Sequence, residues 1–209
     1  LLEYLDFDET ALNTFKPSIC NRLDRNTSGL LVCGKTLEGL RVNNELIKTK
    51  AVKKFYLALV KGKVSKKSAI SGWLYKDEKT NKVIKKNVEF EKADYIQTEY
   101  EPIEYFDDAT LLSVKLITGK THQIRAHLSS ISHPIIGDFK YGNRSVNEAY
   151  KKKYGIKWQM LHSYKLVYEN EDISDTETFK ALKGRCFVAE YNGDFRKVIG
   201  DGNLEDKRS

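Results

Sequence analysis

The sequence contains little cysteine and no long apolar run, and each shortage excludes a class of protein. Its three cysteines, Cys20, Cys33 and Cys186, are an odd number and form no Cys-x-x-Cys pair. This argues against a disulfide scaffold or a zinc site and favours a reducing compartment. No apolar stretch approaches the roughly 20 residues of a membrane span, and no signal peptide is visible. We therefore predict a cytoplasmic chain without a membrane anchor.

Proline is also scarce: three residues, with no low-complexity linker and no repeat in 209 residues. At 40% hydrophobic and 31% charged residues, the chain can build a core. We expect residues 1–209 to form a single domain with a flexible polar tail at 200–209. The chain begins at Leu1 and its only methionine is Met160, so we expect a natural N-terminal segment to be missing.

The net charge of +7 and the pI of about 9.1 suit a polyanionic partner such as a nucleic acid. Charge that serves only solubility is the alternative. Apolar patterning predicts strands near 30–33, 54–60, 98–104, 110–116 and 161–168, and helices after Thr36 and over 121–131. Strands and helices do not alternate regularly. The pattern therefore predicts an α+β fold with a mixed, mainly antiparallel sheet.

One segment matches the phosphate-loop pattern, because Gly29 is followed after four residues by Gly34-Lys35-Thr36. The four intervening residues are apolar, and we expect them to form a strand buried on both faces. Thr36 would then cap the next helix. Nucleotide hydrolysis would instead require residues 29–36 to form a loop around an anion.

Three residues could carry other chemistry. Asp24 lies between Arg22 and Arg25, which would keep it ionised, and an ionised carboxylate can be a nucleophile. Tyr56 could stack on a base or act in proton transfer, and Arg125 could pair with a carboxylate or phosphate. The structural alternatives are a solvated charged loop, strand packing and a surface charge.

Spacing on the helix over 121–131 places His122, Arg125 and Ser129 opposite the apolar face of Ile124 and Leu128. The histidines raise the question of a metal. No His-Glu-x-x-His pattern and no cysteine at a suitable spacing accompanies them. We therefore expect no metal site.

Five segments in order resemble the RluA-type family of RNA pseudouridine synthases. They are NRLDRNTSG at 21–29, KFYLALVKG at 54–62, TGKTHQIRAHL at 118–128, HPIIGDFKYG at 133–142 and LHSYKL at 161–166. The resemblance implies a pseudouridine synthase fold with a central cleft. It implies an RNA isomerase that acts on uridines of rRNA or tRNA, as a monomer and without a cofactor.

By this resemblance, Asp24 matches the nucleophilic aspartate, Tyr56 the tyrosine that packs on the target base, and Arg125 the arginine that pairs with the aspartate. Arg22 matches a residue that can fill the space of a flipped uridine. The matched segments also make His122 and Gln123 candidate RNA contacts. An RNA-binding module without catalysis is the alternative, and the meeting of Asp24 and Arg125 in a cleft beside Tyr56 would decide against it.

The chain departs from the family pattern in three places. Asn21 stands where a histidine is usual, and Lys120 replaces an arginine. The Lys-Pro-x-Gly segment usually found upstream of the aspartate motif is absent, as is the S4 RNA-binding domain of many relatives. We expect both to belong to the missing N-terminal part.

Overall fold

The computed structural model describes residues 2–3, 5, 15–76, 83–169 and 176–200. The strands are β1 (Ser18–Ile19), β2 (Ser28–Gly29), β3 (Cys33–Gly34), β4 (Val52–Lys61), β5 (Ser68–Lys76), β6 (Val83–Lys86), β7 (Asp94–Tyr105), β8 (Ala109–Leu116), β9 (Leu161–Tyr168) and β10 (Cys186–Val188). The helices are α1 (Leu37–Lys48), α2 (Gln123–Ser130), α3 (Arg144–Tyr154), α4 (Glu177–Leu182) and α5 (Gly193–Ile199). Apart from Gly200, the predicted tail lies outside the described residues.

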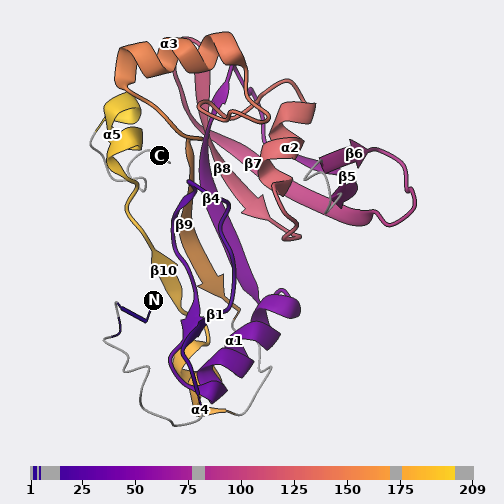
Figure 1. Cartoon of the computed structure of the whole chain (residues 1–209), viewed down its shortest axis with the longest axis vertical. Helices are drawn as coiled ribbons and strands as arrows, with labels where there is room; N and C mark the ends of the chain where they lie inside the picture. The colour runs from indigo at the N-terminus through magenta and orange to yellow at the C-terminus, as the bar shows by residue number, and fades with distance from the viewer. Residues whose placement is uncertain (1, 4, 6–14, 77–82, 170–175, 201–209) are drawn as a thin grey trace.

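One mixed sheet organises the fold, with the strand order β10-β9-β4-β8-β7-β5-β6. Every pair along this path is antiparallel, and β2 adds one parallel pair at β9. The helices lie around the sheet and do not alternate with its strands (Figure 1). The α+β prediction with a mainly antiparallel sheet is confirmed. Within the described residues, no helix has the length and apolar character that a membrane crossing requires.

The main core lies along β4, in the middle of the sheet. Residues Leu57, Leu59 and Val60 have no exposed surface, as expected of a continuous apolar run on a central strand. A bulge in the β4–β9 pairing falls between Phe55 and Tyr56. Bulges change the direction of side chains near functional sites, and this bulge directly precedes Tyr56, a candidate site residue.

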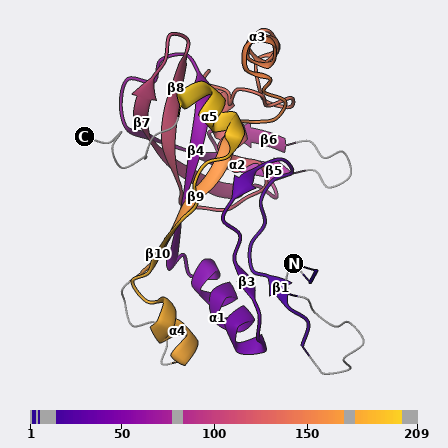
Figure 2. The ribbon, with the colours of Figure 1, turned by 90° about the vertical axis from the view of Figure 1, so that its left-hand side faces the viewer.

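A second, smaller core lies at the far end of β4 and β9, where Leu46, Val52, Leu166 and Phe179 are buried together. Helices α1 and α4 pack there, beside the short β1–β3 sheet (Figure 2). The predicted cap of α1 is confirmed, since the Thr36 hydroxyl accepts a hydrogen bond from the Gly39 N–H at 3.0 Å. The segment that follows Asp24 thus runs between the two cores.

The prediction of a strand buried on both faces at 30–33 is wrong. Only Cys33 belongs to a strand, and Leu31 is 43% exposed. The N–H of Leu30 donates to the Ser163 carbonyl at 2.8 Å, and that of Val32 donates to Asn21 Oδ1 at 2.8 Å. The segment crosses from the main sheet to the β1–β3 pair, so its backbone bonds go to different partners instead of one ladder.

The same bonds exclude a phosphate loop. A phosphate loop turns successive N–H groups toward one anion, but here the N–H groups of Leu30 and Val32 are already bonded to protein. Gly34 packs on Leu40 of α1, where an added Cβ would lie 2.5 Å from the Leu40 backbone. The glycines that match the pattern therefore serve close packing.

Replacing Gly29 by alanine should destabilise the protein and disturb the segment that carries Asp24. Gly29 has φ +108, and a Cβ there would lie 2.1 Å from the Ser163 carbonyl oxygen. We expect the free energy of unfolding to fall by about 1–3 kcal/mol, as for other strained backbone positions. Urea unfolding measures this. Gly193→Ala is the matched control, because nothing lies within 4 Å of its added Cβ, and an equal loss in both variants would contradict the prediction.

Candidate active site

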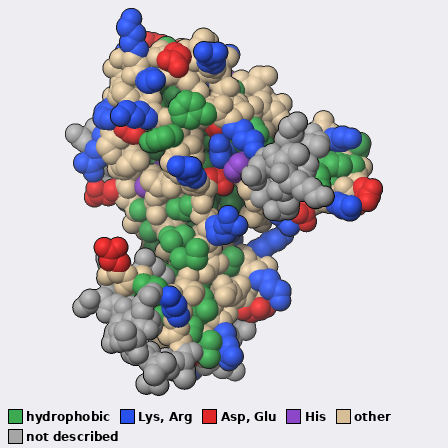
Figure 3. All heavy atoms as spheres, in the orientation of Figure 1, with side chains coloured by type: hydrophobic (Ala, Val, Ile, Leu, Met, Phe, Trp, Pro, Cys, Tyr) green, Lys and Arg blue, Asp and Glu red, His purple; other side chains and the backbone are tan. Residues whose placement is uncertain are grey.

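A cleft of about 580 Å³ opens between the segment after β1, the first half of β4 and the start of α2. Its lining includes Asp24, Tyr56 and His122, together with four cationic residues: Arg22, Arg25, Lys54 and Lys120. Lys and Arg side chains surround the middle of the face shown in Figure 3. The cleft therefore offers one carboxylate in cationic surroundings, which suits a substrate that carries phosphates.

The turn that presents Asp24 is held from two sides. The Asp24 carbonyl accepts a hydrogen bond from the Thr27 N–H at 2.9 Å. Gln159 Nε2 donates to the Arg25 carbonyl at 2.6 Å. Upstream, Asn21 ties the segment to Val32 through its side-chain oxygen. In this position Asn21 fixes the backbone, a task that requires no proton transfer.

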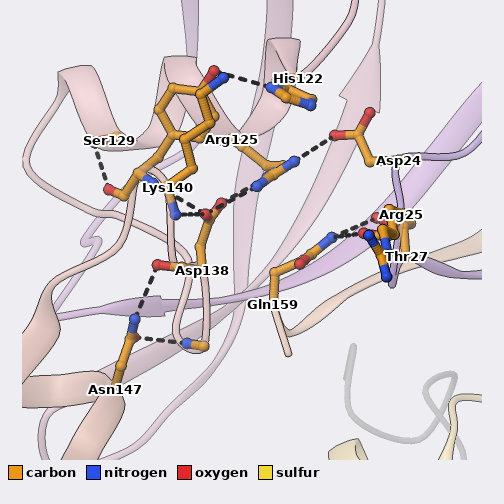
Figure 4. Close-up of polar contacts among 12 residues, drawn as sticks. Asp24, Arg25, Thr27, His122, Arg125, Ser129, Asp138, Lys140, Asn147 and Gln159 are labelled. Carbon is orange, nitrogen blue, oxygen red and sulfur yellow. Dashed lines mark hydrogen bonds and ion pairs between the residues drawn. The ribbon is translucent and has the colours of Figure 1, made fainter. Parts of the chain in front are cut away.

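Arg125 joins two carboxylates that are far apart in the sequence. Its Nη1 donates to Asp24 Oδ2 at 3.2 Å, and its Nε and Nη2 donate to the two Asp138 oxygens at 2.7 and 3.0 Å (Figure 4). Burial lowers the pKa of Arg125, but the bonds and charges of Asp138 and Asp24 outweigh burial and raise it overall. The guanidinium is thus a permanent positive charge with a fixed orientation beside Asp24.

Asp138 is a site residue to which the sequence reading assigned no role. It is 1% exposed, and its Oδ1 also accepts the N–H groups of Lys140 and Tyr141. Asn147 of α3 holds the same loop, donating to the Asp138 carbonyl at 2.9 Å. In the sequence, Asp138 could have been noticed by its place in the matched HPIIGDFKYG segment. A carboxylate that is buried needs a cationic partner.

Tyr141 contacts both His122 and Arg125, at the start and in the middle of the α2 region. Its hydroxyl hydrogen-bonds His122 Nδ1 at 3.0 Å, and its ring lies 5.3 Å from the Arg125 guanidinium carbon. Burial lowers the pKa of His122, and the positive charges of Arg125 and Lys140 add to the effect, against Asp24 and Asp138. His122 is therefore neutral at neutral pH and can exchange hydrogen bonds without bringing another charge.

Burial also raises the pKa of Tyr141 to about 12, above the value of about 10 in an unfolded chain. The folded state then holds this proton more tightly than the unfolded state, so stability is lost as pH rises from about 10 toward 12. We expect the urea midpoint to fall over this range more steeply in the natural chain than in Tyr141→Phe. Parallel profiles for the two proteins would contradict the assignment.

Tyr56 and Lys54 come from the same strand and both line the cleft. Burial raises the pKa of Tyr56 and the Asp24 charge raises it further, while the neighbouring Ser163 side chain partly opposes both. Burial lowers the pKa of Lys54, whose Nζ would lie 3.3 Å from a Cβ added at Gly119. The phenol is therefore neutral and can donate a hydrogen bond, and the Lys54 amine lies inside the cleft, where burial weakens its hold on a proton.

The three candidate RNA contacts all line the cleft, but their side chains differ in availability. Arg22 is exposed, whereas Gln123 is buried. The Gln123 amide donates to Gln97 and Thr98 and accepts from the Thr118 hydroxyl and the Lys120 N–H. These four bonds fill its capacity, so the amide positions the turn before α2. His122 lies just ahead of α2 with φ 57, which starts the helix later than predicted.

Among the residues that the structure describes, no group of three or more His, Cys, Asp or Glu side chains is placed to bind a metal ion. Asp24, which lines the cleft, and the buried Asp138 are joined through Arg125, so both carboxylates already have a cationic partner.

The structure thus combines a mixed, mainly antiparallel sheet with a cleft lined by Asp24 and Tyr56, and Arg125 contacts this aspartate. Residues 5–130 match the family model described as RNA pseudouridylate synthase. The chain belongs to this family.

The similar curated proteins carry the same family name. An uncharacterized RNA pseudouridine synthase of Mycoplasma genitalium is 35% identical over 82% of this chain and 52% of that protein. Ribosomal large subunit pseudouridine synthase D of Borreliella burgdorferi is 36% identical over 78% of this chain and 47% of that protein. The chain spans about half the length of these relatives.

Solved structures share the fold. Human RNA pseudouridylate synthase domain containing 1 superposes with a TM-score of 0.67 at 24% identity, covering 86% of this chain and 70% of that one. Human RNA pseudouridylate synthase domain containing 4 gives 0.67 at 22% identity, covering 88% and 76%. At this identity the likeness concerns the fold alone.

Proposed function

We propose that this protein converts specific uridines of structured RNA to pseudouridine, with ribosomal RNA or tRNA as substrate. The observation that carries the proposal is the contact of Arg125 with Asp24, which lines the cleft together with Tyr56. A module that only bound RNA would have no need of a carboxylate held in a cationic cleft, because a carboxylate repels phosphates.

In this proposal Asp24 acts on the nucleoside, and the hydrogen bond from Arg125 orients its carboxylate. The reaction breaks the bond between uracil N1 and C1′ and forms one between C5 and C1′, while a proton leaves C5 and N1 gains one. Atoms and electrons balance within the nucleotide, so the chemistry calls for no cofactor. Tyr56 forms the wall against which the freed base turns, and its neutral phenol can donate a hydrogen bond to a uracil oxygen.

A stacked base cannot reach Asp24, so the uridine must leave its stack. Arg22 is exposed at the cleft and can fill the vacated space, because guanidinium planes stack on bases. Lys54 and Lys120, which line the same cleft, would hold the flanking phosphates.

Mapping pseudouridines in ribosomal RNA and tRNA from cells with and without this gene tests the proposal and names the target. We expect at least one site to lose its modification and to regain it when the gene is restored. Unchanged maps, together with no product from the purified chain on either RNA, would refute the proposal.

A further inference from the structure

Two exposed aromatic side chains form a pair near the candidate active site. Phe139 and Trp158 are 71% and 46% exposed, and their rings meet edge to face with centroids 5.9 Å apart. Large apolar side chains that stay exposed side by side commonly mark an interaction site. The folded chain gains little from an exposed pair, which suggests that another molecule uses it.

The backbone beneath the pair is rigid. Gly137 packs so closely on the Trp158 carbonyl that an added Cβ would lie 2.1 Å from its oxygen. The Met160 N–H donates to the Ile136 carbonyl at 2.8 Å, and both of these residues are 1% exposed. The two rings are thus presented on fixed loops, and a partner would bind them at little cost in backbone ordering.

The two aromatic residues adjoin, along the chain, two residues that hold the candidate active site. Phe139 directly follows Asp138, which holds Arg125. Trp158 directly precedes Gln159, whose amide holds the carbonyl of Arg25 next to Asp24. Figure 4 shows Gln159 between Asp138 and Arg25. The loops that carry the two rings therefore also carry residues that hold Arg125 and the segment of Asp24.

The surroundings of the pair are basic. Arg25, Lys140 and Lys157 are exposed on the same two loops and the adjoining turn. On the face shown in Figure 3, exposed hydrophobic side chains lie among Lys and Arg side chains below α3. A second copy of a chain with a net charge of +7 would bring like charges together here. Aromatic rings among cations fit a single-stranded nucleic acid, whose bases stack and whose phosphates pair.

We propose that Phe139 and Trp158 form a stacking platform for unpaired bases of the RNA that flank the target nucleotide. The inference rests on the proposed function, because it takes RNA as the occupant. Stacking on aromatic side chains tolerates any base, so the platform adds affinity for unpaired loops and little sequence preference. Substrate choice at this edge then depends on whether the nucleotides beside the target are unpaired.

The test compares binding of two labelled oligomers of equal length by the full chain. One is a single-stranded oligouridylate, and the other keeps the sugar-phosphate chain but lacks bases at its centre. We expect the Phe139→Ala, Trp158→Ala double variant to bind oligouridylate about tenfold or more weakly, with an unchanged salt dependence, since the phosphate contacts remain. The abasic oligomer should bind the natural chain about as weakly as the double variant binds oligouridylate.

Two variants provide the controls. The Phe139→Tyr, Trp158→Tyr double variant keeps both rings and should bind like the natural chain. Tyr105→Ala removes another aromatic side chain, 48% exposed and 5.4 Å from the Lys63 amine, and should leave binding unchanged. Circular dichroism establishes that each variant is folded.

Three results would overturn the proposal. The alanine variant and the natural chain could bind with equal affinity, the natural chain could show no preference for the oligomer with bases, or the mass in sedimentation could rise with concentration only when the two rings are present. The last result would assign the pair to a second copy.

Product formation at saturating RNA separates this inference from the proposed function. The double alanine variant should keep its single-turnover rate at saturating RNA, while its KM for RNA rises. A natural chain that formed no product under any condition would refute the proposed enzymatic function, and the binding comparison would remain valid.

Discussion

Asp24→Asn should abolish pseudouridine formation while leaving the fold and RNA binding in place. The amide oxygen can still accept the bond from Arg125 Nη1 that Asp24 Oδ2 accepts at 3.2 Å, so the cleft keeps its shape. The amide, however, has no negative charge with which to act on the nucleoside. We expect the single-turnover rate to fall by about 10³-fold or more, as when other enzymes lose the group that reacts with the substrate.

Asp194→Asn is the matched control, because it removes the same charge from an ion pair with Lys197 on α5, away from the cleft. It should leave the rate unchanged. Binding of the target RNA, measured by anisotropy, should be at least as tight in Asp24→Asn as in the natural chain, since a charge that repels phosphates is lost. An Asp24→Asn protein that modified RNA at the natural rate would eliminate the assigned role.

Asp138→Asn should produce the largest loss of stability among single amide replacements in this site. Asp138 is 1% exposed and gives both oxygens to Arg125. In the variant, the amide NH₂ group would face an N–H group of Arg125, so two hydrogen-bond donors would oppose each other. The buried guanidinium would also lose its main counter-charge. Breaking a buried pair from one side costs about 3–5 kcal/mol, and we expect the free energy of unfolding in urea to fall by that amount.

Glu45→Gln makes the same chemical change in an exposed ion pair, that with Lys48 at 3.7 Å. It should cost no more than about 0.5 kcal/mol, the usual value for an i,i+3 pair on a helix surface. Asp138→Asn should also lower the modification rate of the protein that remains folded, because Arg125 would no longer be oriented toward Asp24. Equal losses of stability in the two variants would show that Asp138 does not hold Arg125.

The sequence predicted the strands and helices that follow from local patterns of apolar and capping residues. The apolar run at 54–60 became β4, and the alternation at 161–168 became β9 with those bounds. Thr36 capped α1 as predicted, because a cap depends on residues three positions apart. The ordered motifs also brought Asp24, Tyr56 and Arg125 together as candidates before their positions in space were known.

Other features required the folded chain. The apolar residues at 30–32 predicted a buried strand, but their N–H groups bond to β9 and to Asn21, which no local pattern reveals. The helix predicted from Thr121 begins at Gln123, because His122 adopts a left-handed conformation where its ring bonds Tyr141. In both cases contacts between distant segments override the local preference.

By itself, the sequence determined the fold class and which residues to examine, because apolar periodicity and motif order are written along the chain. Tertiary structure alone decided the geometry of the candidate site. Asp24 and Arg125 meet across 101 positions, and the aim of Arg125 depends on Asp138, a buried carboxylate in a loop. Burial raises the pKa of Tyr56 and lowers the pKa of Lys54, so packing favours the uncharged form of both side chains in the cleft. Distances, burial and hydrogen-bond partners arise only when distant segments pack, and these quantities set the chemistry of the side chains.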